Sequence, residues 1–92
     1  MVEHIYNFIE EMYEELEGAE EYANRAISCK DPQRKAMYLD MAKDELHHFE
    51  KLGEMLMNHS HIGEEMKEYI AMKHGAMMKK HAYINYLISS AK

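Results

Sequence analysis

Residues that interrupt or cross-link a chain are scarce in this sequence. Its 92 residues include one cysteine, one proline, four glycines and no tryptophan. The single cysteine, Cys29, excludes a disulfide within one chain and is typical of proteins from a reducing compartment. With so few prolines and glycines, the sequence predicts long helices joined by short connections. We therefore expect an all-α protein with one domain over residues 1–92.

Long apolar runs are also missing. The beginning of the sequence has no basic segment followed by an apolar one, so it does not look like a secretory signal. No apolar run has the length that a membrane-spanning helix needs. From these two observations we expect a cytoplasmic chain without a membrane partner.

Positive charge is in short supply as well. Eleven Lys and Arg stand against 17 Asp and Glu, and the formal net charge of −6 argues against a general nucleic-acid partner. The charge is uneven: residues 1–30 carry eight Glu and two basic residues, whereas residues 61–92 carry five Lys and three Glu. We expect the acidic first third of the chain to attract cations.

Apolar periodicity predicts the first two helices. Over about residues 2–29, apolar residues recur at alternating steps of four and three, as in the seam of a helical bundle. The seam consists of Ile5, Ile9, Met12, Leu16, Ala19, Ala23 and Ala26. Asp31 followed by Pro32 is typical of a helix start, with Asp as the N-cap and Pro as the first helical residue. A second helix is therefore expected over about residues 32–57.

A third helix follows a polar break at residues 58–61. Ser60 can cap it, and it is expected over about residues 61–88. Its apolar stripe consists of Met66, Ile70, Met77, Ile84 and Ile88. Gly18, Gly53 and Gly75 lie inside the predicted helices, where each costs up to about 1 kcal/mol relative to Ala. That cost predicts close packing at the three glycines.

Two residues of the second helix bear on chemistry. Glu45 and His48 are three residues apart, so they are neighbours on one helix face. They lie within an apolar stripe made of Tyr38, Met41, Ala42, Phe49, Leu52, Met55 and Leu56. We therefore expect both side chains to project into the interior, where a carboxylate without a partner is costly. A bound metal cation would relieve that cost, and an inward Glu-x-x-His is the half-site of di-iron helical bundles.

Glu15 supplies a second carboxylate. It is the charged member of a row with Phe8, Tyr22 and Cys29 at seven-residue spacing. The turn near residue 31 is short, so the first two helices should be antiparallel. Glu15 and Glu45 are at similar distances from that turn along the chain, so they should lie at the same height. Two carboxylates and one imidazole make half of a two-metal site, which a two-fold dimer would complete. Such ligands suit Fe or Mn.

The segment from Glu14 to Tyr22, the pair Asp31-Pro32 and the segment from Asp44 to His48 together resemble the ferritin-like superfamily. The half-length encapsulated ferritins are the most similar members, and the resemblance covers roughly residues 5–57. It implies a helical hairpin that completes a four-helix di-iron bundle by dimerisation, an Fe(II)-oxidising activity in iron storage or detoxification, and an encapsulin shell as a further partner.

Carried over by position, this resemblance makes Glu15, Glu45 and His48 the iron ligands and the catalytic residues. Tyr22 would lie beside the ligands. Glu14 and Glu17 would match acidic residues on the route by which metal reaches the site.

Several alternatives stay open. A rubrerythrin-type protein that reduces peroxide would use similar ligands but, without a Cys-x-x-Cys pair, would need an external electron donor. A helical oligomerisation module without catalysis is a third reading. Glu45 and His48 could also be an ordinary pair on a partly exposed helix face. Finally, the Met- and His-rich segments 55–61 and 72–81 have the atoms that bind copper, although Met more often fills gaps in helical cores.

Overall fold

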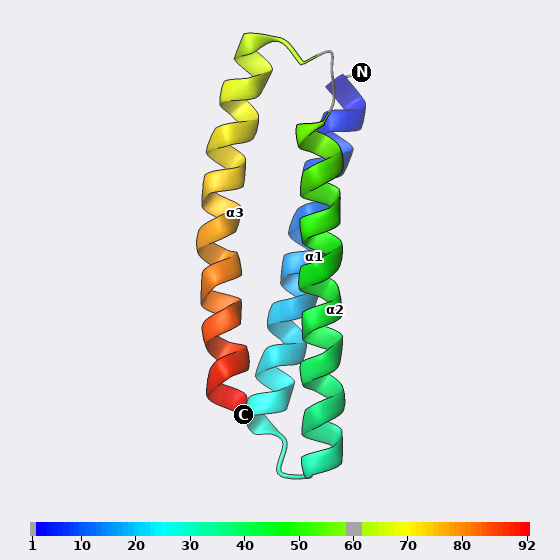
Figure 1. Ribbon diagram of the computed structural model, residues 1–92, viewed down its shortest axis with the longest axis vertical. Coiled ribbons are helices and arrows are strands. Elements are labelled where there is room, and N and C mark those ends of the chain that lie inside the picture. Colours follow the sequence, from blue (N-terminus) through cyan, green and yellow to red (C-terminus); the bar gives the residue numbers. More distant parts are fainter. Residues whose placement is uncertain (1, 59–61) are drawn as a thin grey trace.

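The chain folds into three long α-helices (Figure 1). The computed structural model describes residues 2–58 and 62–92, and side chains from residue 4 onwards within these ranges. The helices are α1 (Val2–Ser28), α2 (Pro32–Met57) and α3 (Glu64–Ala91). Over the described ranges there is no strand, which confirms the all-α prediction and the three predicted helices.

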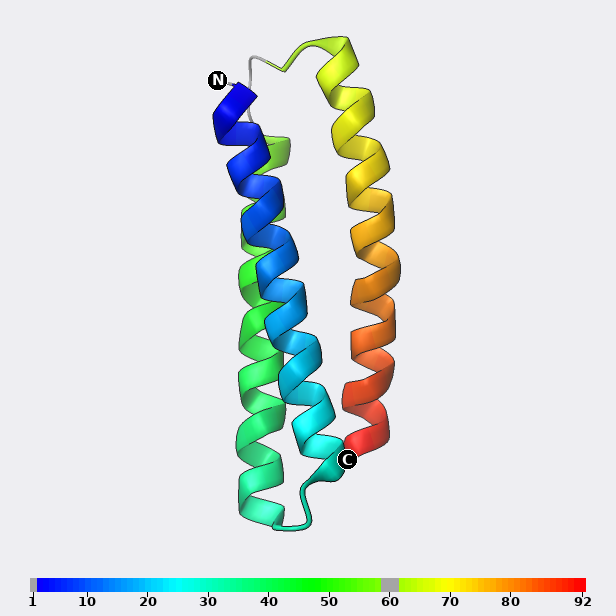
Figure 2. The ribbon, with the colours of Figure 1, turned by 180° about the vertical axis from the view of Figure 1, so that it is seen from behind.

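The predicted turn between the first two helices is confirmed. Asp31 is the N-cap of α2, and its Oδ2 accepts a hydrogen bond of 3.2 Å from the backbone N–H of Arg34. Pro32 is the first helical residue, where its missing N–H costs nothing. This short turn sends α2 back alongside α1, so the two helices are antiparallel (Figures 1 and 2).

The third helix lies further along the chain than predicted. Ser60 and His61, where we expected its start, lie outside the described residues. The N-cap of α3 is Gly63, which provides no side-chain hydrogen bond. The helix continues to Ala91, beyond the predicted end near residue 88, and Ala91 is buried.

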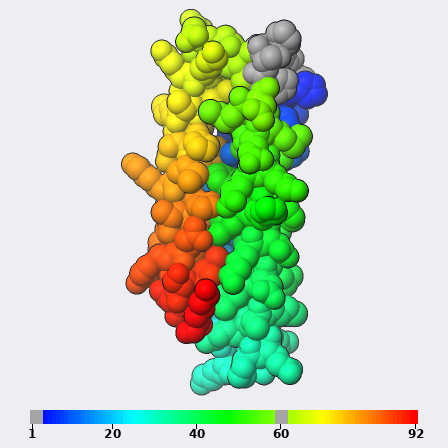
Figure 3. Space-filling view, in the orientation of Figure 1, coloured from blue at the N-terminus to red at the C-terminus, as the bar shows by residue number. Residues whose placement is uncertain are grey.

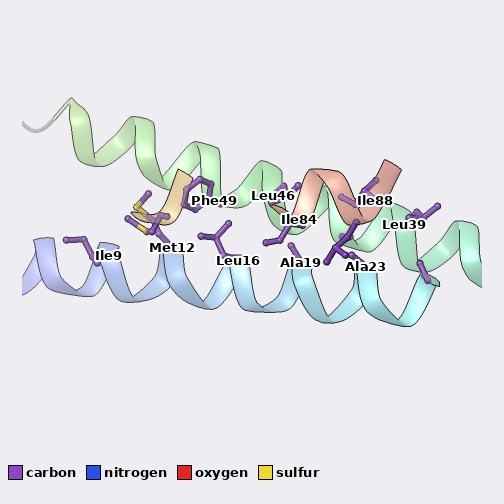
Figure 4. Close-up of a cluster of buried hydrophobic side chains, with 14 of the residues drawn as sticks. Ile9, Met12, Leu16, Ala19, Ala23, Leu39, Leu46, Phe49, Ile84 and Ile88 are labelled. Carbon is purple, nitrogen blue, oxygen red and sulfur yellow. The ribbon is translucent and has the colours of Figure 1, made fainter. Parts of the chain in front are cut away.

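The core is a seam between α1 and α2, to which α3 adds buried residues such as Ile84 and Ile88 (Figure 4). All seven predicted seam residues of α1 are buried. The buried residues of α2 are Leu39, Ala42, Leu46, Phe49, Gly53 and Leu56. Small side chains such as Ala19 and Ala23 bring the two backbones close, and larger ones such as Met12 and Phe49 fill the space beside them.

Close packing at the predicted glycines is confirmed at two positions. A Cβ at Gly53 would lie 3.3 Å from Cε of Met12. A Cβ at Gly18 would also meet a neighbour, as described below. A Cβ at Gly75 would meet nothing within 4 Å, so the prediction is wrong there. Gly75 is exposed on α3, where no neighbouring helix approaches it.

The third helix packs mainly on α1 and much less on α2. Its buried residues are Ile70, Met77, Ile84, Leu87, Ile88 and Ala91. Nζ of Lys80 lies 3.4 Å from Oε1 of Glu20 on α1, and Nε2 of His81 lies 3.2 Å from Oε2 of Glu50 on α2. Between α2 and α3 there remains a groove of about 780 Å³, lined by Phe49, Gly53 and His74 among others.

The space-filling view shows α2 and α3 side by side, with α1 largely hidden behind them (Figure 3). The molecule measures 49 × 18 × 16 Å, so the single chain is a thin rod. Across the part of the chain that the structure describes, none of the helices has the length and apolarity needed to cross a membrane.

Candidate metal centre

Two rows of residues run along α2, one position apart. The buried row contains Leu39, Ala42, Leu46, Phe49, Gly53 and Leu56. The neighbouring row contains Tyr38, Met41, Glu45, His48, Leu52 and Met55. The stripe predicted from the sequence mixed the two rows. The row without ionisable residues faces α1, as the cost of burying charge requires.

Glu45 and His48 therefore do not project into the core of the single chain, and that prediction is wrong. Glu45 is half-buried and His48 is exposed. Both lie on the flank of the α1–α2 hairpin that α3 leaves uncovered. Glu20 and Glu50, which contact α3, project from the other flank.

We call the uncovered side the open flank. It consists of Phe8, Glu15 and Tyr22 on α1 and of Tyr38, Met41, Glu45, His48 and Leu52 on α2. Apart from His48, all of these residues are half-buried. Aromatic and aliphatic side chains thus surround the polar residues on this flank.

The structure does bring the three predicted ligands together. Glu15, Glu45 and His48 each offer a ligand atom, and these atoms all lie within 4.8 Å of one another. Within the described residues this is the one such group of three or more His, Cys, Asp or Glu. The similar heights of Glu15 and Glu45 in the hairpin, expected from their distances to the turn, are thereby confirmed.

One oxygen of the group lacks a hydrogen bond. Oε2 of Glu15 is buried and, among the described side chains, has no hydrogen-bond partner. Nδ1 of His48 is its polar neighbour at 3.4 Å, but not in hydrogen-bonding geometry. The side chain of Glu15 is 26% exposed and that of His48 is 55% exposed. The carboxylate thus has an oxygen directed into the protein with an imidazole beside it.

The carboxyl group of Glu15 disfavours the ionised form of Glu45. A hydrogen bond to Glu15, partial burial and the negative charge of Glu15 raise the pKa of Glu45 from 4.5 to about 7. The imidazole of His48 opposes this rise of the pKa, and the carboxylate of Asp44 adds to it. Near neutral pH, Glu45 is therefore partly protonated in the metal-free protein.

Gly18 also contacts the group, a contact that sequence reasoning missed. A Cβ at this position would lie 2.8 Å from Oε2 of Glu45. The sequence showed a costly glycine one helical turn after Glu15, which predicted close packing. It could not show which residue occupies the space, because Glu45 belongs to the next helix.

The other predicted site residues lie outside the group. Tyr22 is on the open flank and stacks on Tyr38, with 6.3 Å between ring centroids, and the guanidinium of Arg25 lies 5.6 Å from the Tyr22 ring centroid. Glu14 and Glu17 are exposed on α1. The structure therefore places Tyr22 on the same flank as the three predicted ligands and leaves Glu14 and Glu17 in solvent.

The segments with a copper-binding composition contribute no such group in the described part of the chain. His81 faces Glu50 and Asn85, and its ring lies against Phe49 at 5.5 Å between centroids. His74 and Met78 line the groove between α2 and α3. His59 and His61 lie outside the described residues.

Comparisons with protein-family models, curated proteins and solved structures gave no match for this chain.

Proposed function

We propose that the chain binds iron at Glu15, Glu45 and His48 and oxidises Fe(II) at a di-iron centre shared by two copies. The resemblance of residues 5–57 to half-length encapsulated ferritins motivates the proposal. The observation that carries it is the buried Oε2 of Glu15, which has no hydrogen-bond partner among the described residues although Glu45 and His48 lie beside it. A cation would satisfy that oxygen and remove the repulsion between the two carboxylates.

The donor set fits such an ion. Two carboxylates and one imidazole are ligands typical of Fe and Mn, whereas Cu(I) prefers sulfur. Iron held in this way would supply the electrons for reducing oxygen or peroxide.

The protein's own residues prepare the site for a cation. Glu45 is partly protonated near neutral pH, so metal binding displaces this proton and binding weakens as pH falls. His48 is exposed, so its ring can turn towards an ion without disturbing the core. Because α3 does not cover the open flank, ions reach the carboxylates of a single chain from solvent.

A second copy is needed because one chain offers three ligands. Two copies that meet at their open flanks would provide four carboxylates and two imidazoles, the set of a two-metal carboxylate site. The half-buried Phe8, Tyr22 and Leu52 on this flank would then become fully buried. A homodimer, or a larger homo-oligomer built from it, is therefore part of the proposal, and an encapsulin shell would be a further partner.

Two other functions use the same flank. A rubrerythrin-type protein would reduce peroxide at the same ligands with electrons from an external donor. A non-catalytic oligomerisation module would use the aromatic residues of the open flank, and any metal there would be structural. Activity towards Fe(II), towards peroxide or towards neither separates the three functions.

The test measures metal content per chain together with native mass and Fe(II) oxidation. We expect a dimer or a multiple of it, two tightly bound Fe per two chains, and oxidation that saturates with Fe(II). Glu45→Ala should lose bound iron and oxidation while its circular dichroism stays unchanged. Two tightly bound irons per isolated monomer would contradict the shared site, and full oxidation by Glu45→Ala would contradict the ligand set.

A further inference from the structure

We infer that Gly18 is a positioning residue of the candidate metal centre: the side chain it lacks leaves the space that the Glu45 carboxylate occupies. The inference rests on the proposed function for its consequence, which is metal affinity. The contact itself can be tested without metal.

The geometry at Gly18 singles out one neighbour. A Cβ there would lie 2.8 Å from Oε2, 3.4 Å from Cδ and 3.7 Å from Cγ of Glu45. These three nearest atoms all belong to one side chain, and none belongs to the backbone of α2. Gly18 therefore accommodates a carboxylate and is not needed for the helices to approach.

The other helical glycines provide the comparison. At Gly53 the nearest atom is the apolar Cε of Met12, which is helix packing in the core. At Gly75 there is open space. Of the three, Gly18 alone has a predicted ligand as its nearest neighbour.

Helix stability does not explain why position 18 is a glycine. A glycine within a helix makes the helix less stable than an alanine would, and Gly18 lies in the middle of α1. Its backbone does not need a glycine, because no glycine of the chain has a positive φ. Alanine would thus be the better residue for the helix and the worse one for the carboxylate.

An alanine at position 18 should displace the carboxylate and leave the fold intact. The atoms in the way are the far end of a flexible side chain, which can move at little cost. Because Glu15 and His48 are on the same flank, a displaced Glu45 no longer converges with them. We expect metal binding to weaken about 10- to 100-fold, as it does when the residues that orient ligands are changed.

The experiment compares Gly18→Ala with the matched control Gly75→Ala in the full chain. Mn(II) binding is measured by calorimetry, and the unfolding temperature is measured without metal. Gly75→Ala should raise the unfolding temperature by about 4 °C and leave Mn(II) affinity unchanged. Gly18→Ala should lose affinity without a lower unfolding temperature. Wild-type affinity in Gly18→Ala would overturn the inference.

A second arm removes the carboxylate. In a Glu45→Ala background, Gly18→Ala should raise the unfolding temperature as much as Gly75→Ala does. In the wild-type background, Gly18→Ala should raise the unfolding temperature less than Gly75→Ala does. Equal gains in both backgrounds would overturn the inference. This arm needs no metal. A wild-type protein that binds no Mn(II) would contradict the proposed function, but the unfolding temperatures would still decide whether Gly18 makes room for Glu45.

Discussion

Nδ1 of His48 lies 3.4 Å from Oε2 of Glu15, so an exposed imidazole of α2 stands beside a buried carboxylate oxygen of α1. Two residues that are far apart in the sequence thus meet at one point of the open flank. His47, the residue next to His48, is exposed and is not part of the group. This difference between adjacent histidines allows a matched test.

His48→Ala should lose metal, and His47→Ala should retain it. Removing His48 takes one imidazole from each chain and two from a dimer, whereas His47 offers nothing to the group. Bound iron, native mass and Fe(II) oxidation measured on both variants check this. Equal losses in the two variants would mean that the assignment of His48 is mistaken.

Metal-free protein should become less stable as pH rises through the range in which Glu45 ionises. The pKa of Glu45 is about 7 in the folded chain and 4.5 ordinarily. Between these values the folded protein holds a proton that the unfolded chain has released. The stabilisation is thus complete below the lower value and is lost as pH rises through the upper one.

Because the pair is partly exposed, solvent screening reduces the effect. We expect the free energy of unfolding to fall by about 1 to 2 kcal/mol between about pH 5 and pH 8. Urea unfolding in the presence of a chelator measures this change. In Glu45→Gln, the decrease in the free energy of unfolding over this pH range should be smaller by about 1 to 2 kcal/mol. The same decrease in Glu45→Gln as in the wild type would show that Glu45 does not cause it.

Adjacent residues of α2 should respond oppositely to truncation. Leu46 is 5% exposed in the core seam, so Leu46→Ala should lower the free energy of unfolding by about 2 to 5 kcal/mol. Glu45→Ala removes a half-buried carboxylate and should cost little or raise stability slightly. Urea unfolding of the two variants, both without metal, checks the register of α2. A larger loss in Glu45→Ala would contradict it.

His81→Ala should weaken the fold and spare the metal. His81 contacts Glu50 and Phe49 on the flank away from the candidate ligands, and its side chain is 14% exposed. Losing these contacts should cost about 1 to 2 kcal/mol of stability. His74→Ala, in the groove between α2 and α3, is the matched control and should cost less. Loss of iron in either variant, with the oligomer intact, would place a ligand on α3.

Local signals in the sequence were sufficient for the helices and the first turn. Asp31 and Pro32 define the start of α2 by chemistry confined to a few residues. The prediction of the α1 seam is confirmed, because one row of residues along α1 is apolar throughout. The predicted end of α3 near residue 88 is too early, because the predicted stripe ends at Ile88 and does not include the buried Ala91.

The orientation of the candidate ligands could not be derived in the same way. The two rows of α2 repeat at the same steps, so periodicity alone does not choose between them. The choice depends on which row meets α1, and the row with Ala42 and Gly53 allows the closer approach. The role of Gly18 likewise depends on a side chain of another helix.

The uneven packing of α3 also has a consequence for the order in which the molecule opens. The α1–α2 seam is continuous, whereas α3 packs mainly on α1 and makes few contacts with α2, with the groove between part of the two helices. Local opening starts where few apolar contacts hold an element. Amide hydrogens of α3 should therefore exchange with deuterium faster than those in the seam, and the α1–α2 hairpin, which carries the candidate ligands, should be the last part of the chain to open.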